Sequence, residues 1–540
     1  MFETSVPNGR DIAVLDSDVK VAVANSLTAD VYAAMPNGTD VTEYLKLGVD
    51  AGNYAINDGH AFYHTPRDNL AMLDQRSLFH MGASALAAME ALLRQSGNEA
   101  EQQWLYTDIF GWFVLALPQF LSAPLFLLAV VSLVLVASKA GYSPGLRQAL
   151  LPLVALVMGI GLAAGLTYAL GVLRGQSEYS AAYPMALRAT QIAGSLFGAL
   201  LALRWLVGSR PIGGLFLVTW AWLLLLLGAI SWFFPGAAIL IVPSLFPLIG
   251  ALLSSLFHHQ RVARVLYATA ALVFFACTFA GTHITEVSLS LEATAPVTAL
   301  TVFYLLLMAP FFPGPLDSQW TLPKSPATAF ALIVIVAVAV TLMVPSHSID
   351  APKGLSIYHW LGEQPGEAVW NVAGTEPVPE EMQQIAEFEL GPVPFATEPG
   401  QRAPAPAFAT EGLAVTVQEY LEEDGLATYR IGIEGPDSDR LIVRAVEGGD
   451  PISYVDRAGM NNQSANAQYL ACYGRSCRSL QVVVGHPIGE APILEVLGLR
   501  FGLGRESDGL LSARPDWALP RQAGDLRIVT ARLPLSSPRL

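Results

Sequence analysis

Long apolar runs occupy the middle of this chain, from residue 109 to residue 346. Ionisable side chains are nearly absent from these runs and gather in the short segments between them. A helix of about 20 apolar residues crosses the hydrocarbon core of a bilayer, so the pattern predicts a block of eight membrane-spanning helices. Their expected limits are residues 110–137, 149–173, 182–204, 212–232, 236–256, 264–282, 294–313 and 326–345.

The positive charges of the loops between these runs alternate. Every second loop carries Lys or Arg: Lys139 and Arg147, Arg204 and Arg210, Arg261 and Arg264, and Lys324. Cytoplasmic loops are enriched in Lys and Arg, so eight spans place the N-terminal head and the C-terminal tail together on the extracytoplasmic or lumenal side. This topology suits a bacterial inner membrane, or an endoplasmic reticulum or vacuolar membrane in a eukaryote.

Before the apolar block, residues 1–105 show a mixed pattern. Residues 29–35 and 51–56 are strand candidates, and residues 39–45 predict a short helix with a capped start. A longer amphipathic helix is expected to begin near Asp74, because apolar residues recur after it at intervals of three and four. These apolar residues are Leu78, Phe79, Ala85, Leu86, Met89, Leu92 and Leu93. Strands that alternate with helices indicate an α/β domain.

Two segments follow the apolar block. Residues 347–412 are rich in Pro, Glu and Gly and predict a partly extended connection. In residues 413–540, short apolar runs separated by turn residues predict an antiparallel β domain, sandwich-like in architecture. Cys472 and Cys477 either close a small disulfide loop, if this domain faces an oxidising compartment, or remain free.

The composition agrees with a multi-domain membrane protein. Of the 540 residues, 53% are hydrophobic and only 14% are charged, whereas soluble chains carry about 25% charged residues. The formal net charge of -15 comes from the two ends, and the absence of a basic stripe argues against nucleic acid as a partner. The lipid bilayer is the expected partner of the transmembrane block, residues 109–346.

The head contains a series of short motifs. In chain order they are Phe2-Glu3-Thr4, Pro36-Asn37-Gly38-Thr39-Asp40, Gly52-Asn53-Tyr54-Ala55-Ile56, Tyr63-His64-Thr65-Pro66-Arg67-Asp68 and Ser77-Leu78-Phe79-His80-Met81-Gly82. Together they resemble the C-terminal part of the catalytic domain of aminopeptidase Y-type zinc metallopeptidases. The likeness is closer to the membrane-bound branch of the endoplasmic reticulum metallopeptidase and the vacuolar membrane protease. In that branch, eight spans and a lumenal tail follow the peptidase domain.

The resemblance implies a partial α/β zinc-peptidase domain in residues 1–105 and an aminopeptidase-like hydrolysis of peptide substrates. It also implies two zinc ions in the complete site, with His64 as the last ligand, and a neutral imidazole suits Zn²⁺. Asp68 is expected to support the loop of His64. Asp40 is expected to border the active-site cleft, where it would contact substrate or support a ligand, and Tyr63 to line the cleft.

The remaining ligands of this family and its general-base glutamate lie upstream of the position that Met1 occupies here. Two metals are needed to activate water and to polarise the scissile carbonyl. We therefore expect an N-terminally truncated chain with no catalytic residue, an incomplete zinc site and no activity as written. The alternative is a non-catalytic polytopic membrane protein whose head and β tail bind a partner. A transporter is less favoured, because the span interiors contain essentially no ionisable residues.

Overall fold

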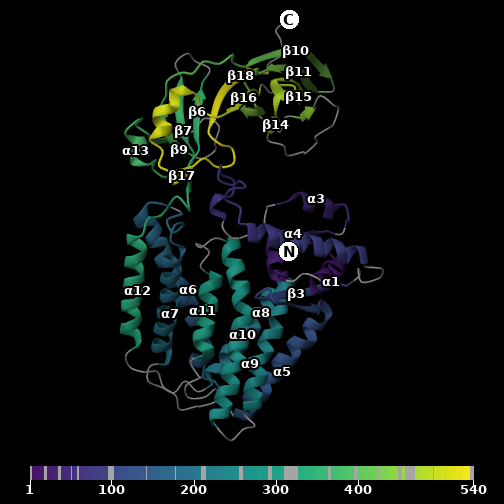
Figure 1. Ribbon diagram of the computed structural model, residues 1–540, viewed down its shortest axis with the longest axis vertical. Helices are drawn as coiled ribbons and strands as arrows, with labels where there is room; N and C mark the ends of the chain where they lie inside the picture. Colours follow the sequence, from purple (N-terminus) through teal and green to yellow (C-terminus); the bar gives the residue numbers. More distant parts are fainter. Residues whose placement is uncertain are drawn as a thin grey trace. The chain divides into compact units, whose positions relative to one another are not determined.

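The structure, a computed structural model, describes residues 3–17, 21–34, 38–49, 51–56, 60–94, 102–140, 143–176, 178–207, 214–254, 260–289, 295–308, 326–362, 367–393, 399–423, 425–447, 453–455, 469–489 and 492–535 (Figure 1). It comprises two compact units. The first contains Met1–His60 and Met72–Ser346, and the second contains Ala61–Ala71 and His347–Leu540. The loop with His64 therefore belongs to the second unit.

The head of the first unit consists of short helices and two two-stranded sheets. Its elements, with the short 3-10 helix η3, are β1 (Glu3–Thr4), α1 (Gly9–Ser17), α2 (Ser26–Ala34), α3 (Asp40–Lys46), β2 (Gly52–Asn53), α4 (Gln75–Arg94), β3 (Trp104–Ile109), β4 (Phe113–Pro118) and η3 (Gln119–Leu121). The 3-10 helix η1 (His60–Phe62) lies where the chain passes from the first unit to the segment Ala61–Ala71 of the second. Strand β1 pairs with β2 and β3 pairs with β4, both in antiparallel fashion. The buried core of the head contains Ile12, Leu15, Ala22, Ala24 and Tyr106.

Two helices predicted for the head are confirmed. The α3 helix begins after Thr39, whose backbone N–H donates to Oγ1 of Thr42 at 3.0 Å in a capping box. The α4 helix begins after Asp74, whose carboxylate accepts the backbone N–H of Arg76 at 2.7 Å. This bond satisfies one of the amide groups that have no partner within a first helical turn.

Two strand predictions for the head require correction. Of residues 29–35, predicted as a strand, positions 29–34 lie in helix α2. The reason is a cap: Oδ1 of Asn25 accepts the backbone N–H of Leu27 at 2.9 Å and so starts the helix. In the region 51–56, the strand is limited to the two residues of β2.

The α4 helix packs against the head with small side chains. Ser84 and Ala91 are buried, whereas most of the large apolar side chains that predict an amphipathic helix are exposed. The exposed members are Leu78, Phe79, Leu86, Met89 and Leu93. The periodicity therefore predicts the helix correctly, but its large apolar side chains do not build the core of the first unit.

A β-hairpin of β3 and β4 lies between α4 and the first helix of the transmembrane block. The apolar run predicts that this helix begins at residue 110, which is wrong: β4 occupies part of the run, and the helix begins at Ser122. An uncharged apolar run does not by itself distinguish a strand from a helix. Here Val114 and Ala116 pack against the head core from one face of β4, and this packing favours the strand.

Helices dominate the rest of the first unit (Figure 1). They are α5 (Ser122–Ala140), α6 (Leu146–Arg174), α7 (Pro184–Val207), α8 (Leu215–Phe233), the 3-10 helix η4 (Pro235–Leu240), α9 (Ile241–Ser254), α10 (Gln260–Leu289), α11 (Ala295–Met308) and α12 (Pro326–Met343). Within the described residues, five helices are long and apolar enough to cross a membrane: Gln119–Lys139, Leu146–Arg174, Pro184–Val207, Leu215–Phe233 and Pro235–Leu253. Three shorter apolar helices, Val265–Thr278, Thr298–Leu307 and Ala327–Met343, also coincide with predicted spans. These helices indicate a membrane protein, while eight crossings and their orientation stay predictions.

Small residues bring α6 and α7 together. A Cβ atom at Gly198 would lie 2.4 Å from the carbonyl oxygen of Met158, and one at Gly194 would lie 3.4 Å from Cα of Ala163. Glycine allows such close approach, and small residues are typical of packed helices in membranes. The packing of α6 against α7 therefore depends on glycine.

The second unit is built mainly from strands (Figure 1). Its elements, with the 3-10 helices η6 and η7, are β5 (Lys353–Gly354), β6 (Ile357–Leu361), β7 (Ala368–Val372), α13 (Glu380–Gln383), β8 (Glu389–Pro392), β9 (Pro399–Pro404), β10 (Ala414–Glu423), β11 (Leu426–Glu434), β12 (Arg440–Glu447), β13 (Ser453–Val455), β14 (Tyr469–Tyr473), η6 (Arg475–Arg478), β15 (Ser479–Pro487), β16 (Ile493–Phe501), η7 (Arg505–Ser507), α14 (Asp508–Ser512), β17 (Ala518–Leu519) and β18 (Leu526–Pro534). One sheet has the order β14-β12-β16-β18-β6-β7-β9-β8 and another the order β10-β11-β15-β13. Ile431 and Val482 of the smaller sheet share a core with Leu441 and Val496 of the larger one, so the two sheets pack in a sandwich-like manner.

The extended connection predicted at residues 347–412 is wrong. This region supplies β6, β7, β8 and β9 to the larger sheet. Strand β6 pairs with the adjacent β7 and also, in parallel, with β18, so that Tyr358 lies opposite Leu526. The pairing with β18 joins segments far apart in sequence and leaves no local signal. Residues 347–412 therefore share one sheet with the region that follows. Cys472 and Cys477 are joined by a disulfide bond, which decides between the two alternatives for this pair.

Candidate functional site

The loop that carries His64 is a succession of tight turns after η1. The backbone N–H of Thr65 donates to the carbonyl oxygen of Phe62 at 3.0 Å, and that of Asp68 donates to the carbonyl oxygen of Thr65 at 3.0 Å. His64 lies in the first turn with a φ of 60°, in the left-handed region. Few residues other than glycine adopt this region, and backbone strain of this kind gathers at functional sites.

Both residues predicted to accompany His64 in this loop contact it. The ring of Tyr63 stacks on the imidazole, with 3.7 Å between the ring centroids. Oδ2 of Asp68 accepts the backbone N–H of His64 at 3.4 Å. All three side chains are exposed, so the loop presents an imidazole, a phenol ring and a carboxylate to solvent.

Asp40 belongs to a different compact unit from this loop. It is the first residue of α3, where an exposed carboxylate is favoured by the positive end of the helix dipole. It belongs to the first unit, whereas Tyr63, His64 and Asp68 belong to the second. Its role beside an active-site cleft stays a prediction.

The described residues do not assemble a complete metal centre. Among them, no group of three or more His, Cys, Asp and Glu side chains could hold a metal ion. Zinc sites in proteins use at least three protein ligands, whereas the loop of His64 offers one imidazole and the carboxylate of Asp68. The side chains in the described ranges therefore do not fit a complete zinc site, and we assign them no catalytic step.

Glu3 has a structural role that its sequence context does not indicate. Its Oε2 accepts hydrogen bonds from Oγ1 of Thr39 at 2.9 Å and from Nδ2 of Asn53 at 3.0 Å. Its Oε1 accepts one from Oγ1 of Thr42 at 2.8 Å. The cluster ties β1 to β2 and to the start of α3, which carries Asp40. Three of the motifs thus each supply polar side chains to one partly buried junction.

Two further carboxylates, Asp30 and Asp108, are held by backbone amides. Asp108 accepts the N–H groups of Ala24 at 3.2 Å and of Gly111 at 2.9 Å. Burial raises its pKa, and these bonds oppose the rise. Burial also raises the pKa of Asp30, whose Oδ2 accepts the backbone N–H of Gly236 at 2.5 Å. These carboxylates therefore serve the packing of the head on its hairpin and on η4.

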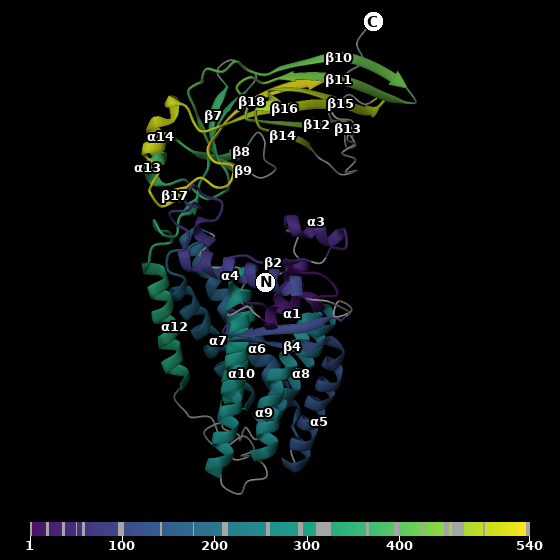
Figure 2. The ribbon, with the colours of Figure 1, turned by 45° about the vertical axis from the view of Figure 1, so that its right-hand side comes forward.

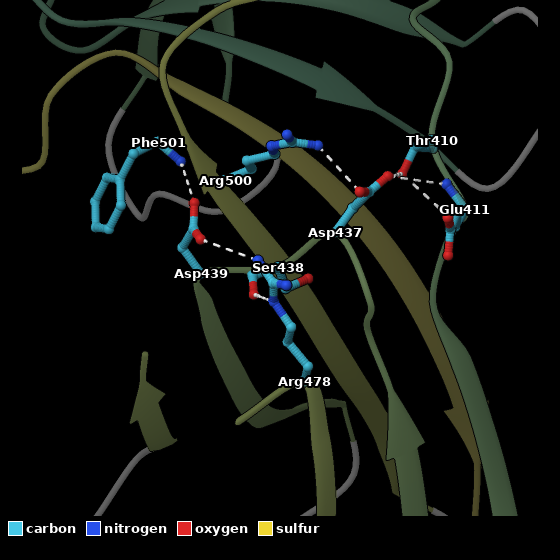
Figure 3. A network of polar contacts seen from close by, with 9 residues as sticks. Thr410, Glu411, Asp437, Ser438, Asp439, Arg478, Arg500 and Phe501 are labelled. Atoms are coloured by element: carbon cyan, nitrogen blue, oxygen red, sulfur yellow. Dashed lines mark hydrogen bonds and ion pairs between the residues drawn. The ribbon is translucent and has the colours of Figure 1, made fainter. Parts of the chain in front are cut away.

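A small pocket in the second unit lies beside a network of charged side chains (Figure 3). Oδ1 of Asp437 accepts a bond from Nη1 of Arg500 at 3.0 Å, and its Oδ2 accepts the backbone N–H of Glu411 at 3.1 Å. The carboxylate of Asp439 accepts the backbone N–H of Phe501 at 3.2 Å. These bonds join groups from neighbouring strand ends, so the network ties the strands of the sandwich together.

Comparison with protein families shows that residues 3–89 match the model of Peptidase family M28. The match includes the four site residues predicted from the sequence, namely Asp40, Tyr63, His64 and Asp68. It supports a peptidase, and peptidases of this family are generally zinc-dependent. Comparisons with curated proteins and with solved structures gave no match.

Proposed function

We propose that the chain belongs to a membrane-anchored, zinc-dependent metallopeptidase. This enzyme would be an aminopeptidase-like exopeptidase that hydrolyses peptide bonds on the extracytoplasmic or lumenal side of its membrane. The observation that carries the proposal is the match of residues 3–89 to peptidase family M28. The long apolar helices after this segment supply the anchor.

His64 is proposed as a zinc ligand. Three features of its loop support this role: the left-handed backbone, the exposed imidazole and the backbone bond to Asp68. A turn of this kind holds the imidazole at the surface, where it can meet a metal that other residues also bind. Asp68 then acts on the loop and does not itself contact the metal, and the stacked ring of Tyr63 limits the rotation of the imidazole.

The chain by itself is proposed to lack peptidase activity. A two-zinc hydrolase activates a water molecule and polarises the scissile carbonyl with its metals. The described residues offer no group of three metal-binding side chains, and a single imidazole cannot hold two zinc ions. We assign His64 to a site that other ligands must complete.

The head and the tail are proposed to share the extracytoplasmic or lumenal side. The alternating charges of the loops carry this topology. Contacts within the first unit support it, because Arg174 at the end of α6 donates to the carbonyl oxygens of Thr341 and Val344 at the end of α12. In addition, Asp30 of the head bonds to Gly236 in the turn that follows α8. By loop charge, each of these helix ends lies on the same side as the head.

Zinc analysis and an aminopeptidase assay on the purified full chain test the proposal. We expect far less than one zinc ion per chain after dialysis and no release of N-terminal residues from peptides. Stoichiometric zinc together with turnover would overturn the inactivity, although it would support the peptidase class. Stoichiometric zinc that is unaffected by His64→Ala would overturn the role of His64.

A non-catalytic, partner-binding protein is the second candidate. The exposed apolar side chains of α4, such as Phe79 and Leu93, favour it, because a bound partner would cover them. Zinc binding that depends on His64 separates the two candidates, since a partner-binding head has no need for this imidazole.

A further inference from the structure

Exposed aromatic side chains gather at the turn between β3 and β4. Phe110, Trp112 and Phe113 are all exposed there, and Trp112 retains 83% of its accessible surface. The rings of Phe110 and Trp112 contact each other, with centroids 6.3 Å apart. Asp108 is the one charged residue between positions 104 and 121, and it is buried. Turns that face water are normally rich in polar residues. The exposed surface of this turn is apolar instead, as expected for a turn that contacts an apolar medium.

The backbone of the turn is held firmly in place. Phe110 has a φ of 52°, in the left-handed region that a bulky side chain rarely adopts. The backbone N–H of Gly111 donates to Oδ2 of Asp108 at 2.9 Å, and that of Trp112 donates to the carbonyl oxygen of Ile109 at 3.0 Å. These bonds keep the aromatic side chains outside the head core in spite of the backbone strain.

The hairpin lies between the head and the helices. Val114 and Ala116 pack against the head core, so Phe113, Leu115 and Leu117 lie on the opposite face of β4, since side chains alternate along a strand. Figure 2 shows β4 running across the direction of the helices. The strand continues through η3 directly into α5, a helix that can cross a membrane. The hairpin therefore lies where the membrane-spanning part of the first unit begins.

A second group of exposed aromatic side chains lies at the turn between α8 and η4. Trp232 and Phe233 end α8 and are both largely exposed. The hydroxyl oxygen of Ser26 lies 3.0 Å from the carbonyl oxygen of Tyr106 in β3 and 2.9 Å from that of Gly236 in η4. The side chain of Ser26 in the head thus joins β3 to η4. The two aromatic groups consequently lie at the same end of the helices.

We propose that the β3–β4 turn inserts Phe110, Trp112 and Phe113 into the interfacial region of the lipid bilayer. With Trp232 and Phe233 it forms an aromatic anchor that holds the head against the membrane surface. Trp is enriched at both interfaces of membrane proteins, because its ring combines apolar area with a polar N–H group. This inference rests on the proposed membrane anchoring and is independent of the zinc chemistry.

Fluorescence quenching of the full chain in phosphatidylcholine nanodiscs tests the anchor. A Cys277→Ala background removes the free cysteine, and the environment-sensitive label NBD is attached at one new cysteine at a time. Trp112→Cys and Phe113→Cys report the turn, Val131→Cys in α5 reports the membrane interior, and Glu43→Cys on α3 reports water. Nitroxide lipids labelled near the headgroup or deep in the acyl chain, and aqueous iodide, serve as quenchers.

We expect the headgroup nitroxide to quench the labels at 112 and 113 severalfold more strongly than the label at 43. The deep nitroxide should act most strongly at 131, and iodide at 43. If the label at 131 is quenched by lipid while those at 112 and 113 respond only to iodide, the anchor is overturned and the membrane helix stands. Protection at 112 from iodide without quenching by lipid would also overturn it, since a protein contact would then cover the turn. If lipid nitroxides do not quench the label at 131, the proposed membrane anchoring itself is overturned.

Discussion

Glu3 and His359 are polar side chains that hold neighbouring parts of the fold together. The carboxylate of Glu3 accepts bonds from the side chains of Thr39, Thr42 and Asn53. His359 is completely buried in the second unit, where its ring lies between those of Trp370 and Phe408. In both residues, hydrogen bonds within the protein replace those with water. Loss of these bonds should therefore lower the stability of the folded chain.

Replacement of Glu3 by Ala should destabilise the start of α3. It leaves the hydroxyls of Thr39 and Thr42 without their acceptor, which costs about 1–3 kcal/mol for partly buried groups. Hydrogen exchange of the amides of α3 in the full chain measures this loss. Glu43→Ala is the matched control on the same helix, because Glu43 is exposed and pairs with Lys46 at the surface; a change there is worth less than about 1 kcal/mol. Equal exchange in the two variants would contradict the structural role of Glu3.

The stability of the second unit should fall as the pH drops below the ordinary pKa of histidine. Burial lowers the pKa of His359 from 6.5, and the hydrogen bond that Nε2 donates to the carbonyl oxygen of Pro406 opposes this shift only in part. The folded chain therefore binds fewer protons than the unfolded chain. The stability that neutral His359 contributes is fully present above 6.5, the pKa of this side chain in the unfolded chain. It is lost progressively as the pH drops below 6.5.

Urea unfolding of the full chain in detergent, followed by tryptophan fluorescence, measures this dependence between about pH 7 and about pH 5. His359→Gln is the control, since its amide can still donate to Pro406 but does not titrate in this range. We expect a flatter pH dependence in the variant. The same slope in both proteins would show that other groups cause it.

At the scale of elements, sequence patterns predict helices better than they predict strands. Each predicted span overlaps an apolar helix among the described residues, because length and hydropathy are local properties. The strands β6 and β9 escape notice because their region is rich in Pro, Glu and Gly, which are uncommon within strands. Strand β6 also needs the distant β18 as a second partner. The hairpin of β3 and β4 is hidden in an uncharged run that a helix would also explain. The motif around His64 lies in a loop, as predicted, but no local pattern reveals that Asp40 belongs to the other unit.

The contact of the head with the turn after α8 depends on Gly236. A Cβ atom at this position would lie 2.2 Å from the carbonyl oxygen of Ser26. Gly236→Ala should therefore push α2 away from η4 and destabilise the first unit by about 1–3 kcal/mol, the usual cost of overpacking. Thermal unfolding of the full chain in detergent measures the effect. Gly165→Ala in α6 is the control, because a Cβ atom there would meet nothing within 4 Å. Indistinguishable melting temperatures would argue against close packing of the head on the helices.

At the scale of the whole molecule, one chain contains a peptidase-like head, a set of apolar helices and a β-sandwich tail. The disulfide between Cys472 and Cys477 suits a tail outside the cytoplasm, because such bonds persist in oxidising compartments. The positive charges of alternate loops favour the same side for the head. The disulfide and the loop charges therefore both support the proposed topology.

Labelling of introduced cysteines in intact cells tests this topology. In a Cys277→Ala background, Glu381→Cys in α13 should react with a membrane-impermeant maleimide from outside. Ser143→Cys, in the loop that joins α5 to α6, should react only after the cells are permeabilised. Both positions are exposed in the structure, so accessibility to water is matched. The reverse pattern would place the head and the tail in the cytoplasm.

The role of His64 in a metal site is the central claim, and a zinc titration of the full chain tests it most directly. Isothermal titration calorimetry would compare the unmodified chain with His64→Ala and with His80→Ala. His80 is the matched control, since its ring bonds to the carbonyl oxygen of Val21 and lies in the same family match. We expect weak zinc binding that His64→Ala abolishes and His80→Ala leaves unchanged. Equal zinc affinity in all three proteins would contradict it.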